Sequence, residues 1–424
     1  MHQDSMELHS AELIERLNAP AMPERLDALR ALRAEVDAGS LPRPRSGSDV
    51  NNHIHTTFSF SPYSPTKAIW TAYNAGLCTA GIVDHDSISG AREFIEAGKI
   101  LSFPTTIGLE LRSTTADTAL GMRNTNNADQ GGVTYLTYHG VPHTQIDAVT
   151  EFLAPVCEAR GRRNRAMVAN INAVCGTALD YDADVVSISQ RRNGGSVTER
   201  HLLYALGLRL IAELGKGEKL LRRLRELVPV GRSAEAQLSD PANPYYEYDL
   251  LGLLKGHLVE KIFVPAGIEE CPDIREVVRF ADERGIIATY PYLGDVTESV
   301  TGDKKAQAYE DSYLDLLFET LEELGFHAVS YMPSRNTMAQ LERIRALCDR
   351  YDMLQISGED INTPRQSFVC TAMHDPLFGN LVDATWALVH HEQAATADLR
   401  RAFNYSPLPL RQRIAAYKAM GEVR

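Results

Sequence analysis

The sequence lacks the features of a membrane or secreted protein. It contains no uninterrupted run of about 18 apolar residues, the length that a membrane-spanning helix needs. Residues 1–5 show no basic start followed by an apolar core, so they do not resemble a secretory signal. The six cysteines are widely spaced and form no C-x-x-C pair, a pattern that favours buried thiols over a disulfide framework. We therefore expect a cytoplasmic protein with no membrane partner.

The sequence also has no excess of basic residues. Its 43 Lys and Arg are outnumbered by 56 Asp and Glu, which gives a formal net charge of −13. Proteins that bind nucleic acid neutralise phosphates with Lys and Arg, so we expect no nucleic-acid partner. A small phosphorylated substrate remains compatible with this charge, because a few local cations and bound metal ions can supply a positive field.

Hydrophobic spacing and composition divide the 424 residues into five segments. Leu8, Leu13 and Leu17 follow helical spacing, and a Pro-rich linker at 41–48 ends this part. The predicted segments are a helical leader (1–47), a first barrel part (48–144), a mainly helical insertion (145–260), a second barrel part (261–369) and a C-terminal helical tail (370–424). We expect the leader to pack on the outside of the barrel and the insertion to cap the active-site face.

Short strand-like segments alternate with helical patterns in both barrel parts. They lie at residues 79–83, 105–109, 131–138, 285–289, 328–331 and 353–357. Helical patterns such as 311–324 and 337–351 separate most of them, which favours a parallel sheet or an α/β barrel. The insertion shows helical spacing instead, in segments that include 146–160 and 165–174. Polar residues repeatedly follow the strands, where an α/β barrel places its active site.

Four short motifs carry groups that bind metal ions. They are His53-Ile54-His55, Asp84-His85-Asp86, Gly108-Leu109-Glu110 and Gly358-Glu359-Asp360-Ile361-Asn362. The two imidazoles of His53 and His55 lie on one side of an extended segment, because side chains alternate with a period of two. Divalent metals bind such mixtures of imidazole nitrogen and carboxylate oxygen.

In the order of these motifs the sequence resembles the PHP family, the polymerase and histidinol phosphatase superfamily. The resemblance covers residues 50–115 and 285–365 and includes the segment Glu199-Arg200-His201. It implies a distorted seven-stranded α/β barrel, a (β/α)7 arrangement, with up to three metals on its C-terminal face. The ligands that it implies are His53, His55, Glu110 as the bridging carboxylate and Asp360 for a first site, His201 for a second and His85 for a third.

The sequence departs from the family pattern at three positions. Phe60 stands where the family has Asp or His, Tyr290 stands in place of His before Pro291, and Asn362 ends the motif in place of His. Asn362 can still bind a metal through its carbonyl oxygen. Tyr290 either faces the substrate in a catalytic role or packs as an aromatic residue at the barrel end. We therefore expect one to two divalent ions (manganese, zinc or iron), with a third site that lacks two of its ligands.

The resemblance implies metal-assisted hydrolysis, most simply of a phosphoester in a small phosphorylated molecule. A divalent metal lowers the pKa of bound water to roughly 7. We expect Asp84 and Asp86 to orient ligand imidazoles, and His85 to act as a ligand or a general acid. Arg200 and Arg365 are the predicted phosphate-binding residues, because a guanidinium matches phosphate geometry. We interpret the basic cluster of Arg160, Arg162, Arg163 and Arg165 as a solvated helix face.

Other functions stay open at this point. The three substitutions also fit a degenerate barrel that binds a metal or a phosphate ligand without turnover. The same fold is compatible with hydrolysis of an amide or another ester, since a fold alone does not fix a function. A nuclease is disfavoured, because the chain is acidic and has no aromatic and basic stripe.

Overall fold

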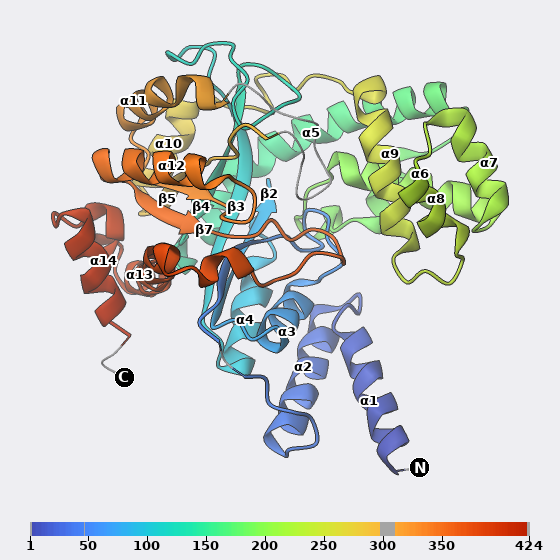
Figure 1. The fold of residues 1–424 in the computed structure, drawn as a ribbon, viewed down its shortest axis with the longest axis horizontal. Coiled ribbons are helices and arrows are strands. Elements are labelled where there is room, and N and C mark those ends of the chain that lie inside the picture. The colour runs from blue at the N-terminus through green and yellow to red at the C-terminus, as the bar shows by residue number, and fades with distance from the viewer. Residues whose placement is uncertain (1, 46, 297–309, 422–424) are drawn as a thin grey trace.

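The computed structural model describes residues 2–45, 47–296 and 310–421, and its strands form one mixed sheet (Figure 1). The strands lie side by side in sequence order from β1 to β7. Their bounds are β1 Val50–Ile54, β2 Thr79–His85, β3 Thr105–Thr114, β4 Val133–His139, β5 Ile287–Pro291, β6 Ala328–Tyr331 and β7 Leu354–Ser357. Each predicted strand segment therefore overlaps a strand of the sheet.

The sheet is nearly closed into a barrel by the chain that follows β7. Ile361 forms a parallel bridge with Ile54 of β1. The His55 N–H donates to the Ile361 carbonyl at 2.9 Å, and the Ile361 N–H donates to the His53 carbonyl at 3.1 Å. This closure brings the motif after β7 beside the H-x-H motif of β1.

One strand runs against the predicted direction. β4 is antiparallel to both β3 and β5, whereas the other neighbouring pairs are parallel. A parallel neighbour requires a crossover connection, usually a helix. Residues 115–132 contain no helix and return the chain directly, so β4 has to run antiparallel. The parallel arrangement that strand–helix alternation favoured therefore does not extend to β4.

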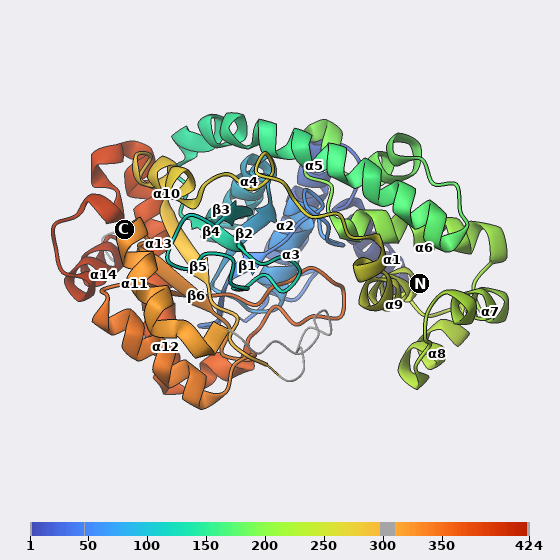
Figure 2. The same ribbon diagram turned by 90° about the horizontal axis from the view of Figure 1, so that it is seen from above.

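Helices surround the strands (Figure 2). In order they are α3 Pro65–Asn74, α4 Ala91–Leu101, α10 Ile274–Asp282, α11 Leu314–Leu324, α12 Met338–Arg350, α13 Gly379–Ala397 and α14 Leu410–Ala419. The tail that we predicted packs on the barrel: Asn52 in β1 donates to the Thr385 hydroxyl of α13 at 2.8 Å, and the Ile107 N–H in β3 donates to Glu392 at 2.7 Å. None of the helices in the described ranges is long and apolar enough to cross a membrane.

A long helix joins the barrel to a second hydrophobic core. Helix α5 spans Ile146–Cys175 without a break, although we predicted two helices there. Its first half packs in the barrel core through Val149 and Leu153, and its second half packs through Met167 and Ile171 in the other core. Between them Arg160, Arg163 and Asn164 continue the buried stripe with polar side chains that find partners. The sequence pattern was misleading because one turn of this continuous helix buries polar side chains between its two apolar halves.

The second core belongs to a helical lobe. We use this name for the second half of α5 together with α6 Glu199–Leu214, α7 Glu218–Leu227, α8 Arg232–Ser239 and α9 Tyr246–Ile262 (Figure 1). Seen from above, the lobe lies at one side of the strands, while α10 to α13 lie at the other (Figure 2). The lobe includes most of the insertion that the sequence predicts.

The leader consists of α1 His2–Arg16 and α2 Met22–Asp37, and α2 packs on α3 and α4. A buried ion pair fixes this contact. Arg25 of α2 donates through Nε to Glu93 of α4 at 2.8 Å, and the Thr66 hydroxyl of α3 donates to the same carboxylate at 2.7 Å. Burial of both charges makes their mutual pairing obligatory, since an unpaired buried charge is costly.

We predict that Glu93→Ala destabilises the protein by roughly 3–5 kcal/mol, because it leaves the Arg25 guanidinium buried without its carboxylate. The measurement is the urea denaturation midpoint of the full chain. Asp27→Ala is the matched control, since Asp27 and Arg30 form an exposed pair at 2.8 Å. Its expected cost is below about 1 kcal/mol. Equal effects of the two changes would contradict the prediction.

Candidate metal centre

Three imidazoles and two carboxylates converge at one end of the barrel. His53 and His55 come from the end of β1, His85 from β2, Glu110 from β3 and Asp360 from the chain after β7. Two triads, His53–His55–Asp360 and His55–His85–Glu110, each have their ligand atoms within 4.8 Å of one another. Glu110 lies between the rings: its Oε2 is 3.1 Å from His85 Nδ1 and 3.8 Å from His53 Nε2.

The sheet register produces this arrangement. His85 and Glu110 are direct neighbours across β2 and β3, so their side chains share the inner face. Asp360 reaches the same place through the bridge of Ile361 to β1. Gly358 permits the approach, because a Cβ there would lie 2.6 Å from the His53 backbone nitrogen. The ligands are thus set by strand pairing and by one glycine.

The His55 ring is oriented by a short relay. Asp84 accepts hydrogen bonds from the Thr56 N–H at 2.6 Å and from the Ser59 hydroxyl at 2.7 Å. Because Ser59 donates to Asp84, its oxygen is free to accept from His55 Nδ1, which lies 3.3 Å away. That tautomer leaves a lone pair on His55 Nε2, 3.2 Å from Asp360 Oδ1. Two lone pairs facing each other require a cation or a proton between them.

Asn362 fits the same centre. Its Nδ2 donates to Asp360 at 2.7 Å, while its buried Oδ1 makes no hydrogen bond within the described chain. Buried oxygen atoms rarely stay unpaired, and an amide oxygen is a suitable ligand for a hard cation. The donor set therefore fits a divalent ion.

Charge and burial keep His53, His85 and Asp360 in the forms that bind metals. His55 differs: burial alone would lower its pKa, but the hydrogen bond and charge of Asp360 raise it. Burial lowers the pKa of His53 to about 4 and, with His55 nearby, lowers the pKa of His85 well below its usual range. Burial alone would raise the pKa of Asp360, but the adjacent His55 and His53 hold it well below the ordinary carboxyl range. Neutral imidazole and ionised carboxylate are the ligating forms.

A cavity opens from these groups toward the helical lobe. Its volume is about 170 Å³. One water needs about 10–15 Å³ on this scale, so the cavity suits a small molecule. The barrel contributes ligand residues such as His53, His85 and Glu110, and the lobe contributes residues of α6 and α9. Five cationic side chains line it: Arg112, Arg160, Arg200, Lys255 and Arg335.

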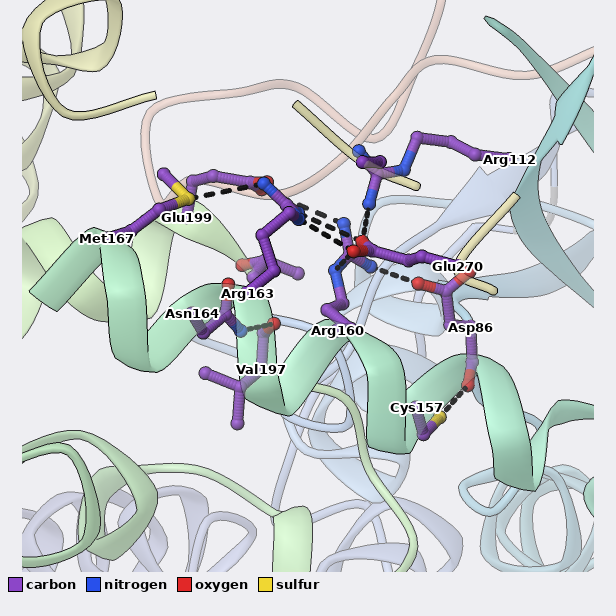
Figure 3. A network of polar contacts seen from close by, with 12 residues as sticks. Asp86, Arg112, Cys157, Arg160, Arg163, Asn164, Met167, Val197, Glu199 and Glu270 are labelled. Carbon is purple, nitrogen blue, oxygen red and sulfur yellow. Dashed lines mark hydrogen bonds and ion pairs between the residues drawn. The ribbon is translucent and has the colours of Figure 1, made fainter. Parts of the chain in front are cut away.

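A buried ionic network ties the lobe to the barrel beside this cavity (Figure 3). Arg163 of α5 donates to Glu270 at 2.7 Å and to Glu199 of α6 at 2.7 Å. Arg160 of α5 pairs with Asp86, and Arg112 of β3 pairs with Glu270. Three guanidiniums thus meet three carboxylates with no net charge, which lets five of these groups be buried, while the Glu199 side chain stays 22% exposed.

This network corrects two interpretations of the sequence. Arg160 and Arg163 are only 3% and 7% exposed, so the prediction of a solvated helix face was wrong for them; Arg162 and Arg165 do pair at the surface. Asp86, predicted to orient an imidazole, pairs with Arg160 instead. Arg112 was missed. It lies two residues after Glu110 on a strand, and this spacing places both on one face.

Three predicted site residues point elsewhere. Pro291 lines the cavity, so the alternation of β5 directs Tyr290 to the outer face, where its hydroxyl donates to Glu310 at 2.5 Å. Arg365 pairs with Asp249 of the lobe at 2.7 Å and lines no part of the cavity. His201 accepts the Thr198 N–H on Nδ1 at 3.0 Å as part of the α6 capping box, and it belongs to neither ligand triad. Its neighbour Arg200 does line the cavity.

Phe60 explains the position of His201. The two rings meet edge to face at 5.0 Å, and Tyr204 packs on the other side of Phe60 at 5.4 Å. Phe60 adopts φ +125°, a backbone region that residues with side chains rarely enter. Aromatic packing against the lobe thus occupies the position at which the resemblance implied a further ligand.

Comparisons with known proteins bear on the fold. No protein-family profile and no curated protein matches this chain. Among solved structures, it resembles a Bifidobacterium adolescentis protein assigned as a metal-dependent phosphoesterase, with 18% identity and a TM-score of 0.50 over 79% of this chain and 96% of that one. It also resembles an amidohydrolase from Chromobacterium violaceum with bound sulfate and no metal, with 15% identity and a TM-score of 0.50 over 76% and 90% of the chains. At these identities the likeness establishes a shared fold.

We predict that Ser59→Ala weakens metal binding roughly 10- to 100-fold, because His55 loses the group that holds its tautomer. The measurement is metal affinity by competition with a chromogenic chelator. Ser61→Ala is the matched control: Ser61 is a buried serine two residues away whose hydroxyl makes no hydrogen bond in the described chain. Unchanged affinity in Ser59→Ala would rule out the relay.

A second prediction concerns Glu310, which Tyr290 contacts outside the cavity. Burial raises the pKa of Glu310 to about 7. Between roughly pH 4.5 and 7 the native state keeps a proton that the unfolded chain releases, so the free energy of unfolding falls as pH rises, by up to about 1.4 kcal/mol per unit. Glu310→Gln should flatten this slope in urea denaturation, and an unaltered slope would contradict the prediction.

Proposed function

We propose that this protein is a metal-dependent phosphoesterase of the PHP type, acting on a small phosphorylated molecule. One observation carries the proposal: His53, His55, His85, Glu110 and Asp360 converge at the end of a cavity whose lining includes five cationic side chains. The fold that the chain shares with a protein assigned as a metal-dependent phosphoesterase supports it, as does the sulfate bound in the other neighbour.

The residues that would hold one ion are His53, His55 and Asp360, and Glu110 with His85 would hold a second, with the Asn362 oxygen near Asp360. A bound divalent metal would supply water of lowered pKa and would neutralise charge on the phosphoryl group. Manganese, zinc and iron suit this mixture of imidazole and carboxylate, and we propose one to two ions per chain.

The protein groups prepare this chemistry before any substrate arrives. Asp84 and Ser59 hold the His55 ring, and the low pKa of His85 favours a ligand over a general acid, because neutral imidazole is a far weaker acid than imidazolium. Arg200 lies close enough for its charge to act on both Asp360 and His85. We propose that Arg200 binds phosphoryl oxygen, since a guanidinium forms paired hydrogen bonds to phosphate.

The cationic lining favours a phosphoester over an amide. A neutral amide can accept a hydrogen bond from a guanidinium but brings no charge to compensate it, whereas a phosphoryl group carries the opposite charge. The second candidate is a protein that binds metal and phosphate without turnover. The loss of the ligand position at Phe60 and the outward direction of Tyr290 favour it, because both reduce the groups available for catalysis.

We predict that the metal-loaded protein hydrolyses p-nitrophenyl phosphate or its diester analogue, and that Glu110→Gln lowers kcat at least roughly 100-fold. The change removes the carboxylate that lies between the His53 and His85 rings. The transition state then loses charge stabilisation of several kcal/mol. Glu269→Gln is the control, since Glu269 forms an exposed pair with Arg162.

The same measurement separates the alternatives. Metal bound at one or more ions per chain, with no turnover of phosphate, ester or amide substrates, would favour the binding role. Turnover of amides with none of phosphoesters would overturn the proposed substrate class while leaving a metal-dependent hydrolase.

A further inference from the structure

The loop after β6 places an arginine in the cavity wall, where none of the described residues gives it a carboxylate partner. Arg335 is 8% exposed and lines the cavity. Its Nε donates to the Leu293 carbonyl at 3.1 Å, but Nη2 makes no hydrogen bond to any described residue. A guanidinium carries five N–H donors, and burial normally requires partners for them.

The other buried arginines of this wall are paired. Arg112 contacts Glu270, and Arg160 contacts Asp86. In the described ranges no carboxylate oxygen lies within ion-pair distance of Arg335. An unpaired buried charge is costly, so a guanidinium that has no carboxylate partner among the described residues fits a place for a bound anion.

The two acidic side chains whose charges act on Arg335 are Glu310 and Asp360. Glu310 is already committed, since it accepts the Tyr290 hydroxyl at 2.5 Å and the Gly294 N–H at 2.7 Å. Asp360 belongs to the candidate metal centre. A cation bound there would compensate the charge of Asp360, and neither carboxylate forms an ion pair with Arg335 among the described residues.

The guanidinium is also held in position before binding. The Arg335 N–H donates to the Met332 carbonyl at 3.0 Å, which closes the loop. Its neighbour Asn336 donates to the same Leu293 carbonyl at 2.8 Å. A side chain fixed in this way loses little conformational entropy when it binds a ligand.

The position relative to Asp360 identifies the kind of anion. Arg335 acts on this carboxylate from the barrel, and Arg200 acts on it from the helical lobe. Because Arg335, Arg200 and Asp360 all line the cavity, an oxyanion bound there can meet one guanidinium from each part of the molecule. A planar fork of N–H donors suits two oxygens of one phosphoryl group.

We infer that Arg335 is a specificity-determining residue that binds the phosphoryl group of the substrate. This inference rests on the proposed function for the identity of the substrate, but the anion site itself does not require turnover. Arg335 selects a charged phosphoryl group over a neutral amide or ester, because only the charged group compensates the buried guanidinium.

Inorganic phosphate is the probe for this site. Its dissociation constant is measured by isothermal titration on the metal-loaded full chain, for the wild type and for Arg335→Met. Loss of a hydrogen-bonded charge pair weakens binding roughly 10- to 100-fold. Arg350→Met is the matched control, because it alters the net charge equally. Arg350 is an exposed arginine at the end of α12, and its guanidinium lies 3.9 Å from the Asp315 carboxylate.

Metal content of each variant is determined by elemental analysis. A phosphate constant within about two-fold of the wild type in Arg335→Met, with metal retained, overturns the inference. If Arg335→Met loses metal, Arg335→Lys decides: it keeps the charge but loses the fork, so weakened phosphate binding with full metal content supports the inference and unchanged binding overturns it.

The outcomes distinguish this site from the proposed activity. If the wild type binds phosphate through Arg335 but hydrolyses no phosphoester, the anion site stands and the proposed enzymatic activity is refuted. If the wild type hydrolyses phosphoesters and Arg335→Met shows the same KM and the same dissociation constant for phosphate, the anion site is refuted and the proposed enzymatic activity stands. Failure of the metal-loaded wild type to bind phosphate at millimolar concentration also overturns the inference.

Discussion

The bridge between Ile361 and β1 is the contact on which the candidate centre depends. Residues 53–55 and 360 are about three hundred positions apart, yet backbone hydrogen bonds of His55 and His53 with Ile361 place them side by side. This bridge also nearly closes the sheet. Without a side chain at Gly358 the two segments approach to backbone contact. Closure of the barrel and assembly of the ligand set are therefore one event.

A second layer of the structure is electrostatic. The lobe is joined to the barrel by guanidiniums and carboxylates in equal number, and these groups bury their charge beside the cavity. Arg160 and Arg112 belong to this neutral network, so they shape the wall. Arg335 lies outside it. Arg112 and Arg160 are paired and hold the architecture, whereas Arg335 has no carboxylate partner among the described residues and is available to a ligand.

The positions at which the sequence departs from the PHP pattern have different structural outcomes. Phe60 fills its place with an aromatic contact to His201 and Tyr204 of the lobe. Asn362 stays in the cavity with a buried oxygen that suits a cation. Tyr290 leaves the cavity altogether and packs behind the sheet. The same degree of sequence departure thus removes one ligand position, keeps another in altered form and moves the third outside.

The sequence by itself determined the strands, the helical leader and the ligand motifs, because periodic burial and short-range residue spacing are local properties. His53, His55, His85, Glu110 and Asp360 were all identifiable from motifs that end strands. Tertiary structure alone decided the direction of β4, the outward side of Tyr290 and the pairing of Arg365 with Asp249. It also decided that Arg160 is buried and that Arg335 has no carboxylate partner in the described chain. These outcomes depend on which groups from distant parts of the chain come into contact. For a buried charge, the free-energy cost depends on whether such a contact supplies a partner of opposite charge.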